Sequence, residues 1–151
     1  MAIYASWVHG NALTIESPEN LVRAGHFGWG TDIETKPFKE TWLHIPLPTP
    51  VIVGDRRTTL NGVFLLFWSD GGSIREVHVW DGPSRLQVFD TDFFKGEHRF
   101  ALDRQNTFTL ARPHNVLWGI GISFFFFGGG GFGGGPGGRL ILAAAGGDFF
   151  S

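Results

Sequence analysis

The chain has 151 residues, a length at which a single domain buries a hydrophobic core without disulfides or metal ions. The absence of cysteine excludes disulfides, thiol catalysis and cysteine-type zinc sites, and a formal net charge of −2 with scattered basic residues excludes the electrostatic footprint of a nucleic-acid-binding protein. Charged residues make up only 17% of the chain and aromatic residues 15%, so few ions are available to cover a monomer and self-association is favoured.

The N-terminal segment from Met1 to Gly10 has no basic region and only a short apolar part, so it does not resemble a secretory signal. The best candidate for a membrane-spanning helix is Val116 to Gly138, but its second half is glycine rather than aliphatic. We therefore expect no transmembrane helix. The compartment stays open between the cytoplasm and export without a signal peptide.

Short apolar or alternating segments, separated by Gly, Pro, Asn and Asp, predict β-strands along the whole chain. The predicted strands are Ile3–Val8, Ala12–Glu16, Leu21–Phe27, Thr41–Leu47, Val51–Val53, Val63–Trp68, Ile74–Trp80, Arg85–Phe89, Thr107–Leu110, Val116–Phe127 and Leu140–Ala144. Thr35–Pro50 is predicted to be a loop that passes through one short strand, because its last three prolines cannot donate ladder hydrogen bonds.

Two hairpins are predicted from turn residues. Val63–Trp68 is expected to turn through Ser69–Ser73 into Ile74–Trp80, which then turns through Asp81–Pro83 into the next strand. The Gly-Gly and Asp-Gly pairs in these turns supply the positive φ angles that tight hairpins need.

Alternation within Ile74–Trp80 separates two faces. Val77 and Val79 share one face with Arg75, and the opposite face carries a polar and aromatic row. Val63–Trp68 is apolar at every position, which predicts a central strand buried on both sides.

The uncharged segment between Arg112 and Arg139 contains four consecutive phenylalanines, Phe124–Phe127. Such a run cannot alternate between core and water, so both of its faces are expected to be covered. Taken together, the pattern predicts an all-β fold: one domain over residues 1–151, a two-sheet β-sandwich of jelly-roll type with a Gly-rich loop at 128–138.

Four segments, Tyr4–Asn11, Gly25–Thr31, Trp42–Pro50 and Trp118–Phe124, carry an aromatic and glycine pattern. Over most of the chain this pattern resembles a family of short, functionally uncharacterised, mainly bacterial proteins. The resemblance implies a compact β domain and supplies no catalytic or binding residues. The Gly-rich tail departs from the family's pattern.

The sequence carries only weak motifs for catalysis or metal binding. The six histidines show no metal-ligand spacing, although His44 and His78 on neighbouring strands could together ligate a metal. Asp90 and Asp92 would share a strand face, where two carboxylates could bind a cation or divide acid and base roles. For a serine nucleophile, there is no Gly-x-Ser-x-Gly elbow. We expect no enzyme activity, no cofactor and no metal site.

Tryptophan is in surplus, with six residues. An exposed indole ring stacks on sugar rings, and Trp80 would share a face with Glu76 and His78 and lie next to Asp81. These four residues form a predicted carbohydrate-binding platform. The alternative is that the tryptophans fill the core or a subunit interface.

The function favoured by composition is a non-enzymatic, self-associating structural or interaction protein, forming a homo-oligomer, shell or filament. A carbohydrate-binding module is the alternative, and a membrane-inserting pore-former comes third because the phenylalanine run does not alternate as membrane strands do. The residues predicted to make the self-association contacts are Phe124, Phe125, Phe126, Phe127, Phe132, Phe149, Phe150, Trp29 and Trp42.

Overall fold

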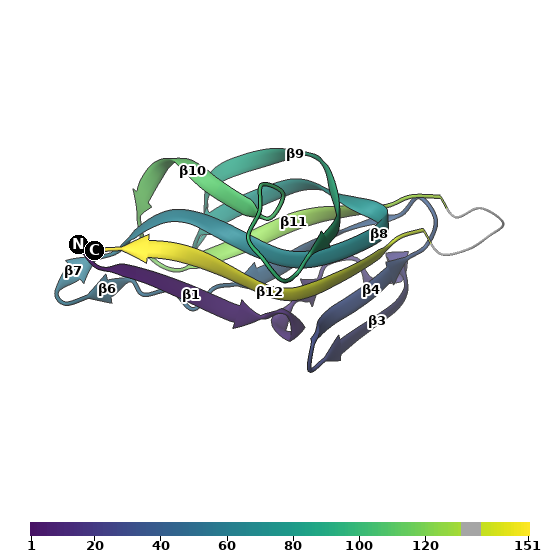
Figure 1. Cartoon of the computed structure of the whole chain (residues 1–151), viewed down its shortest axis with the longest axis horizontal. Helices are drawn as coiled ribbons and strands as arrows, with labels where there is room; N and C mark the ends of the chain where they lie inside the picture. Colours follow the sequence, from purple (N-terminus) through teal and green to yellow (C-terminus); the bar gives the residue numbers. More distant parts are fainter. Residues whose placement is uncertain (131–136) are drawn as a thin grey trace.

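A computed structural model describes residues 1–130 and 137–151, and this part of the chain is built almost entirely of β-strands (Figure 1). The strands are β1 Ile3–His9, β2 Thr14–Ile15, β3 Leu21–Phe27, β4 Gly30–Thr35, β5 Glu40–Pro46, β6 Ile52–Val53, β7 Arg56–Arg57, β8 Thr59–Asp81, β9 Ser84–His98, β10 Thr107–Asn115, β11 Ile120–Gly128 and β12 Arg139–Phe150. Two 3-10 turns, Gly10–Ala12 and Pro18–Asn20, flank β2. The all-β prediction is confirmed.

Ten strands form one antiparallel sheet, and β6 and β7 form a separate two-stranded one. The 23-residue strand β8 is the central strand of the large sheet. The first half of β8 pairs with β12 on one edge and β10 on the other, and its second half pairs with β11 and β9. Beyond β12 lie β1, β4 and β3, and beyond β11 lie β5 and β2.

The sheet folds over itself at one end of the molecule. Figure 1 shows β8 running toward the right-hand side of the view and turning back there, with β12 in one layer and β11 in the other. Backbone hydrogen bonds join the crossing segments at this end: Gly129 N–H donates to the Gly71 carbonyl, Phe38 N–H to Gly129, and Thr35 N–H to Gly138. The sandwich is therefore one continuous sheet bent into two layers.

A single core lies between the layers. It takes alternate side chains from the strands of both halves, because one face of each strand points inward. The largest fully buried side chains are Phe67, Phe124, Phe126, Phe149, Ile33, Leu43, Ile45, Leu60, Leu65, Ile74, Ile120 and Ile122.

The predicted hairpin at Ser69–Ser73 is wrong, whereas the one at Asp81–Pro83 is confirmed. Residues 63–68 and 74–80 do not pair with each other, because the chain continues as one strand that changes partner between Asp70 and Gly72. Gly71, at φ +72°, supplies the bend that the Gly-Gly pair predicted, but the bend carries the strand into the second layer instead of closing a turn.

Strand β4 lies where no strand was predicted. Its sequence, Gly30–Thr35, is polar, and Asp32 is buried in it. Arg139 of β12 holds that carboxylate through two hydrogen bonds, Nε to Oδ1 at 3.0 Å and Nη2 to Oδ2 at 2.6 Å. The partner lies 107 positions away in the sequence, so nothing local predicts this buried strand.

Candidate functional site

The outer side of the layer formed by β5, β11 and the second half of β8 gathers polar and aromatic side chains. Register places them in adjacent rows: His44, Ser123 and His78 in one, and Trp42, Phe125 and Glu76 in the next. Trp80 follows in a third row with Pro46 and Gly121. We call Trp42, His44, Glu76, His78, Trp80, Ser123 and Phe125 the aromatic face.

The prediction that Glu76, His78 and Trp80 share a face is met in this geometry. Val77 and Val79 lie on the opposite side, fully buried in the core. Arg75 departs from the predicted alternation, because a register shift between Ile74 and Glu76 lets Ile74 point inward and brings Arg75 over the outward ring of Phe127.

Asp81 does not belong to the platform. It is 1% exposed, and its carboxylate accepts hydrogen bonds from the backbone N–H groups of Leu117, Trp118 and Gly119 at 2.7–3.0 Å. His114 Nε2 lies 2.7 Å from its Oδ2. Burial opposes ionisation, but these donors outweigh it and hold the pKa of Asp81 below its ordinary value. Asp81 fixes a loop and has no capacity left for a ligand.

Polar contacts organise the aromatic face. His44 Nδ1 lies 2.7 Å from Ser123 Oγ, and His44 Nε2 lies 3.0 Å from Glu16 Oε1. A carboxylate only accepts, so Nε2 carries the proton toward Glu16 and, in the neutral ring, Nδ1 accepts from the Ser123 hydroxyl. The carboxylate of Glu16 is exposed, whereas Ser123 is only 8% exposed and its oxygen keeps acceptor capacity beside His44.

Aromatic rings fill the centre of this face. Trp42 packs against His78 and Phe125, with ring centroids 4.7 and 5.3 Å apart, and His78 Nε2 lies 2.6 Å from Glu76 Oε1. The neighbouring rings and polar groups therefore hold one another in fixed orientations.

A hollow opens beside this cluster, over Gly121. Its volume is about 370 Å³, and its lining residues are His44, Ile45, Pro46, Trp80, Gly121, Ile122 and Ser123. In the outward row Gly121 stands between Pro46 and Trp80, so one side chain is missing from the surface. A Cβ placed on Gly121 would meet nothing within 4 Å, so packing does not require glycine at this position. We call this depression the Gly121 hollow.

Ser123, His44 and Glu16 follow the order of a hydrolytic triad, but they lack an oxyanion site. The strand that carries Ser123 is paired on both edges, with β5 over Gly121–Phe127 and with β8 over Ile120–Gly128. Its ladder N–H groups are therefore committed to carbonyls and do not stabilise a developing oxyanion.

The residues predicted for self-association do not form one patch. Phe124, Phe126 and Phe149 are fully buried within the chain, so their assignment to intermolecular contacts is wrong. Phe124 and Phe126 are inward residues of β11 and Phe149 is an inward residue of β12, and all three belong to the core between the layers of the same chain. Phe132 lies outside the described residues.

The remaining predicted contact residues are scattered. Phe125 and Trp42 are half-buried on the aromatic face, Phe127 packs beneath Arg75, and Phe150 pairs with Ile3 at the end of β12. Trp29 is 50% exposed at the β3–β4 turn in the other layer, stacked on Phe27 with ring centroids 4.8 Å apart.

Sequence reasoning missed His44, Ser123 and Gly121 as neighbours of Trp80. Their proximity depends on the register of β5, β11 and β8, which no local pattern encodes. Asp81, by contrast, was misplaced although the alternation of β8 puts it on the side of Val77 and Val79.

Neither a metal cluster nor a membrane helix is found in the part of the chain that the structure describes. No group of three or more His, Asp or Glu side chains among these residues could hold a metal ion. Within the same residues, no helix has the length and apolar character needed to cross a bilayer.

These features define an all-β protein with its polar and aromatic groups gathered on one sheet face. The chain belongs to a family of unknown function, DUF6623, whose model matches residues 1–124. No curated protein matches the chain.

Among solved structures, the chain is similar to the crystal structure of an exo-β-1,3-galactanase from Phanerochaete chrysosporium with β-1,3-galactotriose. The two share 14% sequence identity with a TM-score of 0.30, and the match covers 97% of this chain but only 29% of the galactanase chain. A likeness of this degree carries no inference about activity.

Proposed function

We propose that this protein is a non-enzymatic carbohydrate-binding domain that seats a neutral sugar ring in the Gly121 hollow. The observation that carries the proposal is the missing side chain between Trp80 and Pro46, directly beside the His44–Ser123 pair. The hollow is one side chain wide, and apolar surface on two sides is combined with hydrogen-bonding groups at its edge.

The chemistry of this surface matches that of a pyranose. The apolar face of a sugar ring packs on an indole such as Trp80, while hydroxyl groups at the ring edge donate to fixed acceptors. Ser123 lines the hollow and its Oγ is such an acceptor; His44 contacts it at 2.7 Å and is itself held by the Glu16 carboxylate at 3.0 Å. Because these groups are already oriented by one another, little side-chain entropy is lost on binding.

The test uses substitutions that fill or strip the hollow. Gly121→Val adds a strand-favouring side chain into open space, so the fold is expected to persist while the sugar is excluded. Gly119→Val is the matched control, since Gly119 also has nothing within 4 Å of an added Cβ and lies outside the hollow. Trp80→Ala removes the stacking surface.

Binding is measured by tryptophan fluorescence and calorimetry with tri- and tetrasaccharides of glucose, galactose, mannose and N-acetylglucosamine. At least one oligosaccharide should bind, with affinity lost in Gly121→Val, reduced roughly 10-fold or more in Trp80→Ala, and kept in Gly119→Val. Unchanged affinity in Gly121→Val, or no binding by any of these sugars, would refute the proposal.

Self-association is a second candidate function, supported by the edge strand β3. In the described part of the chain β3 pairs with β4 alone, and Arg23 is its only Lys, Arg, Asp or Glu residue. Val22, Phe27 and Trp29 are exposed along it and at its turn, by 57%, 43% and 50%. An edge without lysine or proline is a template for pairing with a second copy.

Light scattering over a concentration series tests this candidate. If β3 pairs with another copy, Val22→Lys should lower the average mass, whereas Thr109→Lys, an exposed control position on β10, should not. A wild-type mass that stays at that of one chain across the series would rule the candidate out.

A further inference from the structure

A second pocket lies at the end where the sheet folds over. Its volume is about 490 Å³, and its lining combines the bend of β8 with parts of β9 and β11. It shares no lining residue with the Gly121 hollow. Of its lining residues, the six used in the argument below are Ser69, Asp70, Arg75, Phe93, Lys95 and Phe127.

Arg75 is the central group of this pocket. Its guanidinium carbon lies 4.0 Å from the ring centroid of Phe127 and 4.8 Å from that of Phe93, within cation–π distance of both. Among residues 1–130 and 137–151 it makes no ion pair or hydrogen bond, and its Nε is buried without a partner. The two rings hold the guanidinium in place, and within the described residues its N–H donors have no acceptor.

Other arginines near aromatic rings in this protein are paired with carboxylates. Arg99 lies 5.1 Å from the Phe100 ring and binds both carboxylate oxygens of Glu97, and Arg139 lies 5.3 Å from the Trp68 ring and binds Asp32. A stacked arginine is therefore ordinarily satisfied by an anion here. Arg75 has the aromatic support without the anion.

Ser69, another residue of the pocket lining, carries a second orphan polar atom. Ser69 is 3% exposed, and its Oγ has no hydrogen-bond partner in the described part of the chain. A buried hydroxyl without a partner is energetically unfavourable. Phe93, which walls the pocket, has a positive φ of 52° that is unfavourable for a bulky residue. Two residues with unpaired polar atoms and one with a strained backbone therefore belong to the lining of one pocket.

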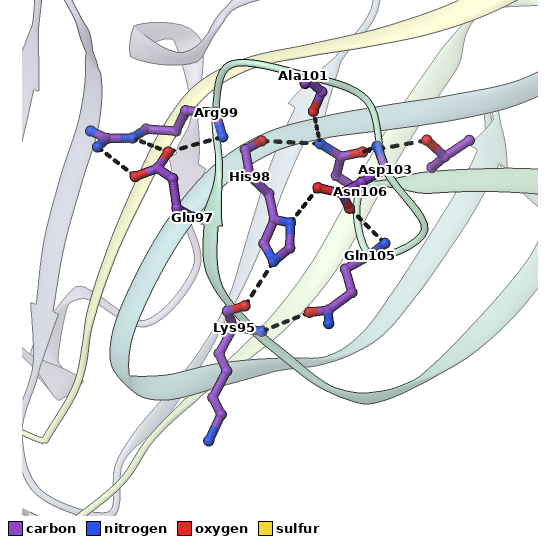
Figure 2. Close-up of polar contacts among 9 residues, drawn as sticks. Lys95, Glu97, His98, Arg99, Ala101, Asp103, Gln105 and Asn106 are labelled. Carbon is purple, nitrogen blue, oxygen red and sulfur yellow. Dashed lines mark hydrogen bonds and ion pairs between the residues drawn. The ribbon is translucent and has the colours of Figure 1, made fainter.

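Lys95 adds a second positive charge, and its backbone is fixed by the loop that follows it (Figure 2). His98 Nε2 lies 2.8 Å from the Lys95 carbonyl oxygen, and the Lys95 N–H donates to Gln105 Oε1 at 3.4 Å. Asp70, also in the lining, offsets one charge, so Arg75 and Lys95 leave the pocket with a net positive charge of one.

We propose that this pocket binds the carboxylate of an acidic monosaccharide unit, with the carboxylate held by Arg75 and Lys95 and the sugar ring packed on Phe93 and Phe127. A planar guanidinium supported on both rings presents its N–H edge to a planar carboxylate, which is the geometry of bidentate recognition. The volume of about 490 Å³ admits one such ring. The proposal does not depend on the Gly121 hollow.

Calorimetry tests this proposal with sodium D-glucuronate and with D-glucose, an uncharged sugar of similar size. Glucuronate should bind saturably and glucose should not, and added salt should weaken binding. Arg75→Gln should reduce the affinity roughly 10- to 100-fold, the effect of losing a charge-assisted hydrogen bond. Lys95→Gln, at an exposed position, should reduce it a few-fold, so the test does not rest on one variant.

Arg99→Gln is the matched control, because Arg99 is stacked on aromatic rings but already paired, and it should bind as the wild type does. Gly121→Val should also bind glucuronate normally, which separates this site from the proposed neutral-sugar site. Equal binding of glucose and glucuronate would overturn the proposal, as would wild-type affinity in both Arg75→Gln and Lys95→Gln. Displacement of glucuronate by an equal concentration of phosphate would overturn its assignment to a carboxylate sugar.

Discussion

His98 and Asp103 form a close ion pair across one loop, with 2.6 Å between Nδ1 and Oδ2. The other ring nitrogen of His98 lies 2.8 Å from the carbonyl oxygen of Lys95. Both partners are acceptors, so both bonds form only when the ring carries two protons. Burial opposes this charge, but the bonds to Asp103 and Lys95 outweigh it and raise the pKa of His98, while the pKa of Asp103 is lowered against its own burial.

Stability should therefore depend on pH through this loop. Because the pKa of folded His98 is raised, its contribution is complete below its ordinary value of 6.5 and is lost as pH rises through the folded value. The contribution of Asp103 is complete above 3.8 and is lost as pH falls through its lowered folded pKa. Urea unfolding from pH 5 to pH 9 should show a falling free energy of unfolding.

In His98→Gln this decline at higher pH should disappear, because glutamine does not titrate. His26→Gln is the control, since His26 is exposed and bonds to a hydroxyl, Thr31 Oγ1. An identical decline in wild type and His98→Gln would contradict the assignment of the titration to this ring.

The buried carboxylate of Asp81 should be a major determinant of stability. Asp81→Asn places an amide group against backbone N–H donors, so hydrogen bonds to Leu117, Trp118 and Gly119 are weakened or lost. We expect a loss of about 2–4 kcal/mol in the free energy of unfolding. Asp90→Asn, at an exposed position, should change it by less than about 0.5 kcal/mol.

Adjacent phenylalanines in β11 should differ sharply in their contribution. Phe126→Ala empties a fully buried site and should cost about 3–5 kcal/mol, whereas Phe125→Ala, on the half-buried aromatic face, should cost about 1 kcal/mol. Urea unfolding of both variants measures the difference. Equal losses would mean that the two faces of β11 are equally covered.

The two arginines around Asp32 should contribute unequally. Arg139 makes a bidentate contact at 2.6 and 3.0 Å, whereas Arg23 reaches the same carboxylate only at 3.3–3.4 Å. Arg139→Gln should therefore cost about 1–3 kcal/mol and Arg23→Gln less than about 1 kcal/mol. A larger loss of unfolding free energy in Arg23→Gln than in Arg139→Gln would contradict this order. It would show that Arg23, which also binds Glu34 at 2.8 Å, is the main partner of Asp32.

Many strand positions and strand faces follow from the sequence, because they depend on local alternation, although β4 and the outward Arg75 did not. β3 lies at its predicted position, Leu21–Phe27, and Val77 and Val79 point inward as expected. Turn residues predicted the bend but not the strand pairing, since Gly71 and Gly72 bend a continuous strand where a hairpin was predicted. A positive φ angle specifies a local bend and not the partner found beyond it.

The candidate sites could not be predicted from local sequence patterns, for a related reason. The Gly121 hollow requires three strands in register, and the Arg75 pocket requires Phe93 and Phe127 from two other strands. Only the sheet pairing brings these side chains together. The expectation that the phenylalanine run is covered on both faces was wrong, because the strand alternates: the chain's own second layer buries Phe124 and Phe126, whereas Phe125 and Phe127 are only half-buried on the outer side.

The central position of β12 also determines the order in which the molecule assembles. The β3–β4 and β8–β9 hairpins join neighbouring segments and can form early, but β1 pairs with β12 from Ile3 opposite Phe150, across nearly the whole sequence. Because such loop closures are entropically slow, we expect refolding in milliseconds to seconds rather than microseconds. Until β12 inserts between β1 and β8, both of those strands have an open edge, so the refolding yield should fall as protein concentration rises.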